Sequence, residues 1–246
     1  MNHFEIKRVC PEETARNENG FSIVELLITF MIIAIMSGAV AFYLNATEKL
    51  HKADDAALTI IDVMQEARQR SLTQRETMRV AIDKTTNTIS LIDENSPTTA
   101  NDDVLLRTVT LPDANLVSIG DPPGEISANP PEPFPVPTID FKFSSYPSSN
   151  SHTVATLRFQ SNGSIVDAGN SPTGSGAVSS GSTLHVWSKS DDQDGVTDTY
   201  LVSRAITTIG TTGSIRLWEY NPKNDPGKEW QDSRLTGTFG GQTTGG

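Results

Sequence analysis

The chain has 246 residues and a formal net charge of −11, with 19 Lys and Arg against 30 Asp and Glu. This length accommodates one domain with an additional segment, or two small domains. The acidic balance disfavours general binding to nucleic acid or to anionic lipid, because both need clustered cations. The single cysteine, Cys10, excludes an intramolecular disulfide and a zinc site built from cysteines.

An apolar segment of 24 residues extends from Phe21 to Leu44 and contains one formal charge, Glu25. As a helix it would be about 36 Å long, which is enough to cross the hydrocarbon core of a bilayer. It is preceded by three cations, Lys7, Arg8 and Arg16. Since basic residues beside a span favour the cytoplasmic side, we expect the N-terminal end in the cytoplasm and the bulk of the chain outside it.

Two common classes of segment also fit this length and composition. One is a plain signal anchor, and the other is a secretory signal peptide, since Ala39-Val40-Ala41 matches the pattern that signal peptidase accepts. Glu25 counts against both classes, because an ionisable group costs roughly 2.5–3.5 kcal/mol near the centre of an inserted helix and less near its end. A residue of this kind is normally retained for a function and needs a partner.

The residues around this acid carry a family resemblance. Gly20-Phe21-Ser22-Ile23-Val24-Glu25, followed directly by the apolar segment, resembles the processing site of type IV pilins and of the pseudopilins of type II secretion. The resemblance implies a leader over residues 1–20 and cleavage by a prepilin peptidase after Gly20. It also implies N-methylation of Phe21 and a role in assembly for Glu25, at the fifth mature position.

Cleavage after Gly20 would create a charged α-amine at one end of an otherwise apolar helix. Glu25 lies little more than one helical turn from that amine and has the opposite charge. The two groups could pair within one helix or between neighbouring subunits, so that neither charge is left alone in lipid. Such pairing would favour staggered packing of helices in an assembly.

The helix is expected to continue beyond the membrane. Apolar or small residues recur at intervals of three and four, at Leu50, Ala53, Ala57, Ile60, Met64 and Ala67. The first proline after the apolar segment is Pro97, so nothing forces a break before about Ser71, and Gly38 is the only weak point. The sequence predicts a membrane-spanning half over residues 21–44 and an amphipathic half over residues 45–73 that packs on a head.

After the helix the hydrophobic period changes to two, which indicates strands. Residues 78–82 and 88–92 flank Asp83-Lys84-Thr85-Thr86-Asn87 and predict a hairpin. Further strands are predicted at residues 104–111, 138–143, 154–160, 182–187, 199–209 and 214–220. Short strands separated by Gly, Pro and Ser turns indicate an α+β fold with a β-rich, sandwich-like head over residues 74–235, laid on one helix.

Two inserts and a tail have unusual compositions. Seven of the fourteen prolines lie between Pro122 and Pro137, where extended backbone with few hydrogen bonds is expected, and we interpret this segment as a surface loop. Residues 169–182 are rich in Gly and Ser, and residues 236–246 form a low-complexity tail that we expect to be flexible. We interpret both inserts as loop decoration, with contact to a partner as the alternative.

Two segments of the head resemble the GspH/FimT family of minor pilins and pseudopilins. Residues 157–165 contain the F-x-x-x-G turn of that family, and residues 205–218 contain T-G-S-I-R, where the family has T-G-R-[IV]-R. Ser214 replaces the first arginine of this motif, which weakens the carry-over of a basic C-terminal surface that contacts DNA. Gly163 and Gly213 also fit hairpin turns that need a positive φ.

Motifs of catalysis are not found. The head contains His152 and His185, but the sequence has no G-x-S-x-G nucleophile elbow, no P-loop and no dinucleotide fingerprint. We therefore expect no enzymatic activity and no cofactor.

The best metal candidate is an acidic segment of the head. Asp192, Asp194 and Asp198, with Gly195 for a sharp turn, could supply oxygen ligands to Ca²⁺. Leu201 stands where an EF-hand would have its bidentate glutamate. We interpret the segment as an acidic hairpin loop and keep calcium binding as the alternative.

Together these observations predict a minor subunit of a pilus-like filament, inserted once in the bacterial inner membrane with its head in the periplasm. The first hypothesis is a pseudopilin of a type II secretion system, and the second is a type IV minor pilin that acts in pilus assembly, adhesion, motility or DNA uptake. The expected partners are prepilin peptidase and other pilins or pseudopilins, contacted through the N-terminal helix, whereas nucleic acid is not expected. A third class, a monotopic anchored binding protein, would show an uncleaved N-terminus or one at Phe42.

Overall fold

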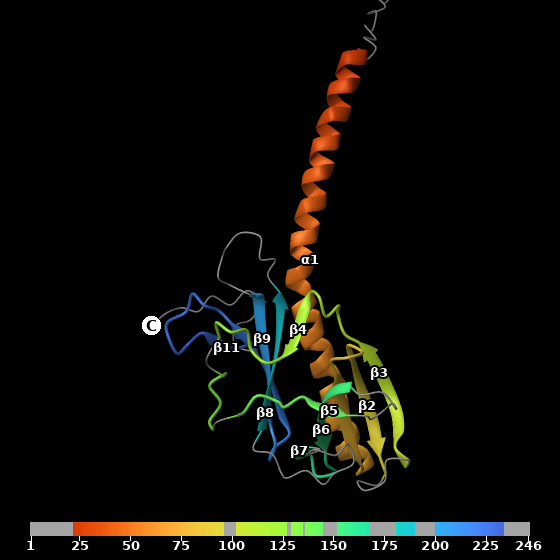
Figure 1. The fold of residues 1–246 in the computed structure, drawn as a ribbon, viewed down its shortest axis with the longest axis vertical. Coiled ribbons are helices and arrows are strands. Elements are labelled where there is room, and N and C mark those ends of the chain that lie inside the picture. Colours follow the sequence, from red (N-terminus) through yellow and green to blue (C-terminus); the bar gives the residue numbers. More distant parts are fainter. Residues whose placement is uncertain are drawn as a thin grey trace, which may run out of the picture. The chain divides into compact units, whose positions relative to one another are not determined.

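The computed structural model of the chain describes residues 22–95, 102–126, 129–134, 136–144, 152–167, 181–189 and 200–233. The chain divides into two compact units, residues 1–44 and residues 45–246. One helix, α1 (Ile23–Gln74), contributes to both units, and the strands belong to the second, which we call the head (Figure 1).

The helix α1 is 52 residues long and continues through Gly38 without a break. This agrees with the absence of proline from the segment, because a single glycine weakens a helix far less than a proline does. The helix ends at Gln74, and Arg75 follows with a φ of 60°. A residue in this left-handed conformation is a common way for a helix to terminate.

The predicted apolar stripe of the second half of α1 is buried in the head. Ala53, Ala57, Ile60, Met64 and Ala67 are all fully buried, as the three-and-four spacing predicts. Ala56 and Val63 widen the stripe and belong to the same core.

The first sheet contains six antiparallel strands. Its order is β3-β2-β1-β6-β5, and β7 also pairs with β6. The strands are β1 (Thr77–Asp83), β2 (Thr88–Glu94), β3 (Val104–Thr110), β5 (Lys142–Ser144), β6 (His152–Phe159) and β7 (Ile165–Asp167). The predicted hairpin is β1–β2, and Asn87 in its turn has a φ of 54°.

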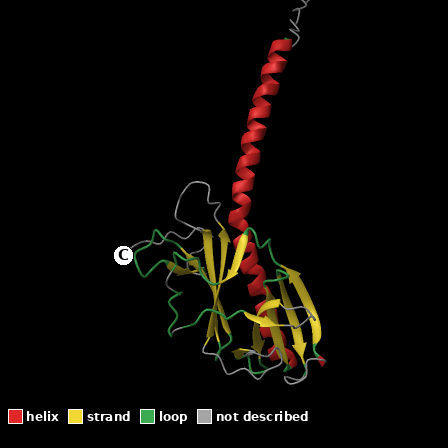
Figure 2. Ribbon diagram, in the orientation of Figure 1, coloured by secondary structure: helices red, strands yellow, loops and turns green. Residues whose placement is uncertain are grey.

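The second sheet contains five antiparallel strands in the order β11-β10-β9-β8-β4. Figure 2 shows the strands of the head in yellow and α1 in red. The strands are β4 (Val117–Gly120), β8 (Gly181–Lys189), β9 (Tyr200–Ile209), β10 (Ser214–Tyr220) and β11 (Trp230–Asp232). The strands β8 to β11 follow one another in the sequence and lie side by side. β4, which comes much earlier in the chain, pairs with β8 and forms one edge of the sheet.

One core lies between α1 and both sheets. In the first sheet, Val80 lies opposite Leu91 on one side and opposite Leu157 on the other, and all three are buried. In the second sheet, Ile206 has Leu184 as its neighbour on β8, and both belong to the same hydrophobic cluster as Val80 and the helix stripe. Each sheet turns one face to this core, but β1 and β8 bury consecutive residues and therefore both faces. On the other face of the first sheet, Ala81 forms a small cluster with Ile92 and Val154.

The strand prediction differs from the structure in the shortest elements. β4, β7 and β11 have three or four residues each and were not predicted, because a run of that length shows too little alternation. The predicted strand at residues 138–143 is reduced to β5, which begins at Lys142, and to an isolated parallel bridge between Thr138 and Thr183.

The proline-rich segment at residues 122–137 has no helix or strand among its described residues and exposes several of them, as expected of a surface loop, but other residues of it are held by the head. Its described residues pack on the face of the second sheet that is turned away from α1, where Ile126 joins Ala205, Trp218 and Trp230 in a second apolar cluster. The carboxylate of Glu132 is fully buried, and it accepts hydrogen bonds from Thr207, from Trp218 Nε1 at 3.2 Å and from Arg216 at 2.9 Å. We refer to residues 122–137 as the proline strap.

Candidate functional site

The start of α1 is defined by Ser22. Its carbonyl accepts a hydrogen bond from the Leu26 N–H at 3.1 Å, and its hydroxyl accepts one from the Val24 N–H at 3.3 Å. Ser22 is therefore the N-cap, and Glu25 is the third residue of the helix. Ser-x-x-Glu matches the capping-box pattern, but the described contacts form only its Ser22 half, in which the serine hydroxyl accepts from the first turn of the helix.

The Glu25 carboxylate has no hydrogen-bond or ion-pair partner among the described residues, although its main chain is engaged. The Thr29 hydroxyl, one turn further along the helix, donates to the Glu25 carbonyl at 2.9 Å and to the Leu26 carbonyl at 2.8 Å. A negative charge in the first turn is favoured by the partial positive charge of the helix N-terminus. The carboxylate is thus favourably placed on its helix and still available to a cation.

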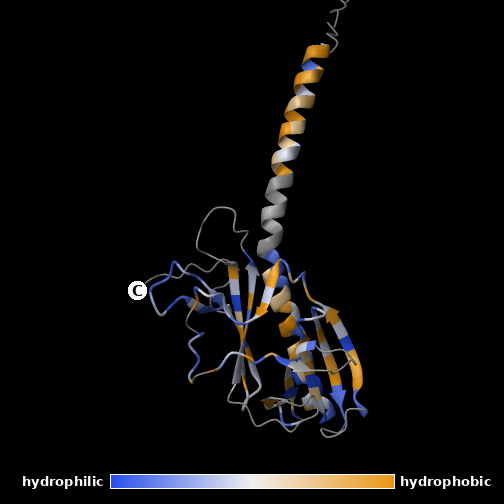
Figure 3. Cartoon of the chain, viewed as in Figure 1, coloured by the Kyte–Doolittle hydropathy of each residue, from blue (hydrophilic) through white to orange (hydrophobic). Residues whose placement is uncertain are grey.

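The described residues of the helix after Glu25 are mostly hydrophobic, as the colouring of Figure 3 shows. Over Ile23–Val40 the mean hydropathy is 2.4, and none of these 18 residues is buried inside the protein. Leu27, Phe30 and Met31, on successive parts of the helix, are each more than 60% exposed. Among the described residues, this helix is the one that is long enough and apolar enough to cross a membrane. Such a surface requires lipid or other apolar helices as its surroundings.

Several residues singled out from the sequence lie outside the described residues. They are the processing residues Gly20 and Phe21 and the calcium candidates Asp192, Asp194 and Asp198. Within the ranges that the structure does describe, no group of three or more His, Cys, Asp or Glu side chains is placed to hold a metal ion.

The head brings together the two turns that carry the second resemblance. Gly163 has a φ of 82° and Gly213 a φ of 62°, as the hairpin interpretation predicts. The turns touch, because Ile165 N donates to the Gly210 carbonyl at 2.7 Å and a Cβ at Gly213 would lie 2.0 Å from the Gly163 carbonyl oxygen. Only glycine fits at this close approach.

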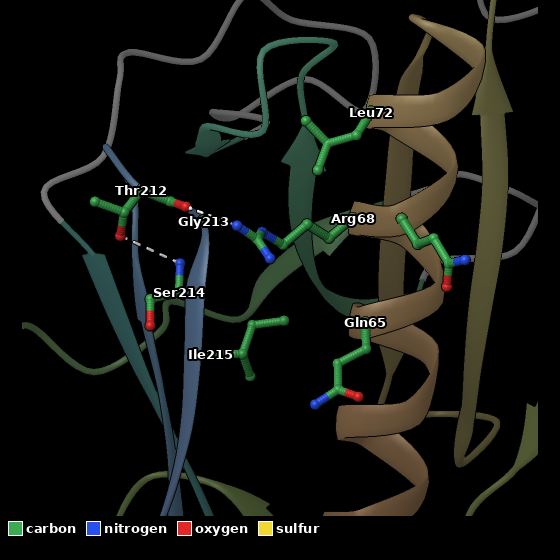
Figure 4. A pocket seen from close by; sticks show the side chains of 8 residues that line it. Gln65, Arg68, Leu72, Thr212, Gly213, Ser214 and Ile215 are labelled. Atoms are coloured by element: carbon green, nitrogen blue, oxygen red, sulfur yellow. Dashed lines mark hydrogen bonds between the residues drawn. The ribbon is translucent and has the colours of Figure 1, made fainter.

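A groove of about 560 Å³ lies beside these turns, between α1 and the start of β10 (Figure 4). Its helix side is formed by Gln65, Arg68, Gln69 and Leu72, and its strand side by Thr212, Gly213, Ser214 and Ile215. The Arg68 guanidinium reaches across and donates to the Thr212 carbonyl at 3.2 Å. We call this the α1–β10 groove. The sequence analysis missed it, because a helical arginine gives no sign of which strand it will face.

The polar residues buried in the first sheet form ion pairs. Glu94 accepts from Arg158 at 2.6 Å and lies 3.6 Å from Arg79, which also pairs with Asp103. Burial raises the pKa of Glu94 above its usual value, while the arginines oppose this effect.

His152, one of the two histidines of the head, pairs with Asp83, which also accepts from the main-chain amides of Thr85 and Thr86. Burial would raise the pKa of Asp83, but the hydrogen bonds from His152, Thr86 and Thr85 hold it below its usual value. This is the arrangement of a stabilised hairpin turn.

The second histidine, His185, is fully buried under the proline strap. Its Nε2 lies 3.3 Å from Asn129 Oδ1, and its ring contacts Trp230 with centroids 5.6 Å apart. Burial lowers the pKa of His185 to about 4, and the charge of Asp121 only partly opposes this. His185 is therefore neutral at physiological pH.

Comparison with known proteins gives one match. Residues 15–41 match the prokaryotic N-terminal methylation motif, which includes Gly20, Phe21 and Glu25. No curated protein and no solved structure matches the chain.

The match covers the processing residues and most of the apolar part of α1. The matched motif is that of the type IV pilin and pseudopilin class. Together with the apolar helix it places the chain in the bacterial inner membrane, anchored by its N-terminal helix, with the head in the periplasm. The motif is that of structural subunits, so the chain is a structural protein and not an enzyme.

Proposed function

We propose that this type IV pilin-like protein is a minor pseudopilin of a type II secretion system, a structural subunit of a periplasmic pilus-like filament or of its tip. The observation that carries the proposal is Glu25, an acid without a described partner at the start of an apolar helix that matches the methylation motif. Prepilin peptidase would cut after Gly20, and other pseudopilins would pack on the apolar surface of α1.

The proposed role of Glu25 is to compensate the α-amine of Phe21 of its own or a neighbouring helix. An isolated carboxylate in lipid is costly, and an amine of opposite charge removes most of that cost when the two groups meet. Each incoming subunit would therefore be held at the axial position where its amine and the acid of its neighbour coincide. The action of the protein is mechanical, through helix packing and contacts of the head.

The second candidate is a type IV minor pilin that acts in pilus assembly, adhesion, motility or DNA uptake. The F-x-x-x-G and T-G-S-I-R segments resemble the GspH/FimT family, which occurs in both systems. Ser214 stands where the T-G-R-[IV]-R motif has its first arginine, which makes a DNA-binding role less favoured. The genes that surround this one in its genome would distinguish a secretion operon from a pilus operon.

Neither role requires a cofactor, and we propose none. Calcium held by Asp192, Asp194 and Asp198 remains the alternative proposal, and a calcium-dependent rise in melting temperature that Asp194→Asn abolishes would support it.

The charge of Glu25 can be separated from its size and polarity by two substitutions. Glu25→Gln keeps the length and polarity of the side chain and the Ser-x-x-Glu/Gln pattern, but removes the charge. We expect Glu25→Gln and Glu25→Ala both to be cleaved and methylated normally and to be incorporated into sheared filaments at least about tenfold less than the wild type. Intact mass of the membrane-extracted chain reports cleavage and methylation, and immunoblotting of sheared filaments reports incorporation.

Thr29→Ala is the matched control, because it removes a polar group one turn away without changing the charge. It should incorporate as the wild type does. Normal incorporation of Glu25→Gln would show that charge compensation is not the role of this acid. A natural N-terminus at any residue other than Phe21 would refute the assignment to the pilin class of processing.

A further inference from the structure

We propose that the α1–β10 groove is a docking site for an extended segment of another protein that carries a carboxylate. The segment would add to the open edge of β10 as a strand and place its acidic side chain on Arg68. This inference goes beyond the filament role and does not depend on it, so its failure would leave the proposed function untouched.

The first argument is the open strand edge. β10 pairs with β9 along Ser214–Glu219, whereas β11 covers only Trp218–Tyr220 on the other side. Ser233 N donates to the Leu217 carbonyl, so the main-chain groups of Leu217 point away from β9. By the two-residue period of a strand, the N–H and C=O of Ile215 point the same way, where no strand of the described part pairs with them. An edge of this kind is a template for an added strand.

The second argument is the state of Arg68. Its guanidinium makes one hydrogen bond to protein, from Nη2 to the Thr212 carbonyl, and its Nε is buried without a hydrogen-bond partner. No carboxylate of the described residues lies within ion-pair distance of it. The Nε is closed to solvent and lies against Gly213, where a Cβ would be 2.9 Å from it, so a ligand would bind the Nη1 and Nη2 side of the guanidinium. A carboxylate can bind that side with two parallel hydrogen bonds. Arg68 is therefore prepared for an anion that the described part of the chain does not provide.

The third argument concerns the kind of partner. Ile215 and Leu72 offer apolar contacts at the two sides of the groove, and Gln65 offers an amide that can bond to a peptide backbone (Figure 4). A peptide strand uses all of these features, since its side chains alternate and its main chain pairs with the edge. A nucleic acid would instead meet one groove cation on a chain with a net charge of −11.

Binding can be measured on the full chain in detergent micelles by fluorescence anisotropy. The probe is a labelled nine-residue peptide of alternating threonine and valine with a central glutamate and blocked ends, and its twin has glutamine at the centre. We expect saturable binding of the glutamate peptide and binding at least about tenfold weaker for the glutamine peptide, as the loss of a charge-assisted hydrogen-bond pair implies. Arg68→Gln should remove the preference.

The matched control is Arg75→Gln, which makes the same change of charge at an exposed arginine just after the same helix. It should keep the preference for the glutamate peptide. Near-UV circular dichroism of both variants checks that the head remains folded.

Strand addition has its own readout, the hydrogen exchange of the Ile215 amide. This exchange should slow at least about tenfold when the glutamate peptide is bound, because the amide acquires a hydrogen bond. Equal binding of the two peptides, no binding of either, or unchanged exchange at Ile215 would each overturn the proposal. So would Arg68-dependent binding of a twelve-nucleotide thymidine strand without peptide binding, or self-association of the chain that Arg68→Gln abolishes.

Discussion

Glu25 and Ser22 have different roles at the start of α1. The Ser22 hydroxyl caps the helix, whereas Glu25, whose carboxylate has no hydrogen-bond partner among the described residues, is the single charge in an apolar span. The sequence points to the charge, because an acid in such a segment is unusual. The hydrogen bond from the Val24 amide to the Ser22 hydroxyl shows in addition where the helix begins.

Gly213 and Gly227 provide a matched pair of residue-scale substitutions. Both have a positive φ, of 62° and 84°, but a Cβ at Gly213 would meet the Gly163 carbonyl oxygen at 2.0 Å, whereas Gly227 has open space. We expect Gly227→Ala to lower the free energy of unfolding by about 1 kcal/mol and Gly213→Ala by at least about 3 kcal/mol. Urea denaturation of the two variants tests this, and equal losses would contradict the close contact of the two turns.

His185 predicts a loss of stability in acid. The unfolded histidine takes up a proton below its ordinary pKa of 6.5, whereas the buried side chain does so only near its lowered pKa of about 4. Between these values the unfolded state binds more protons, so the free energy of unfolding falls as the pH falls through this window. The loss attributable to His185 between pH 7 and pH 4.5 is about 2–3 kcal/mol.

The measurement is urea denaturation at both pH values for the wild type and for His185→Gln. The variant should lose less stability, and the difference between the two chains isolates His185 from other titrating groups. Among these, Glu94 has a raised pKa and acts with the opposite sign in the same range. An identical pH dependence in both chains would refute the prediction.

At the scale of elements, the longest ones could be predicted and the shortest could not. The helix stripe and the strands β1, β2, β3, β6, β8, β9 and β10 have enough residues to show a period of 3.6 or of two. The strands β4, β7 and β11 are three or four residues long and depend on their neighbours for their conformation.

The proline strap is a surface loop as expected, but its contacts with the second sheet are seen only in the structure. Glu132→Ala would leave Arg216 without its carboxylate and Trp218 Nε1 without one of its acceptors. We expect it to lower the free energy of unfolding by about 2–4 kcal/mol and to change the tryptophan fluorescence of the folded head, since Trp218 contacts the carboxylate.

The control for the strap is Asp140→Ala. Asp140 pairs with Lys142 at 3.5 Å, but its side chain is 72% exposed, so its loss should cost less than about 1 kcal/mol. A cost of that size for Glu132→Ala as well would mean that the strap does not stabilise the head.

At the scale of the whole molecule, the head has a complete core of its own. The buried apolar residues begin with Ala53 on α1, and none lies in the unit formed by residues 1–44 among those described. We therefore expect a chain that begins at Asn45 to fold and to stay in aqueous solution without detergent. The chain that begins at Phe21 should need detergent or lipid, because its apolar surface is exposed.

Thermal unfolding followed by circular dichroism tests the independence of the head. The fragment from Asn45 should unfold cooperatively, and Ile60→Ala in this fragment should cost about 2–5 kcal/mol, since Ile60 is fully buried. A fragment without cooperative unfolding would show that the head depends on the first unit.

The sequence by itself determined the membrane helix, the processing motif with Glu25, the continuation of α1 and the β-rich character of the head. These properties are encoded in residues close together along the chain, through period, charge and motif. Only the tertiary structure decided that the Gly163 and Gly213 turns touch and that Glu132 of the proline strap pairs with Arg216 of β10. It also decided that Arg68 lines a groove together with the start of β10. Each of these depends on which distant segments pack together, and that choice is made by the shared core and not by any local pattern.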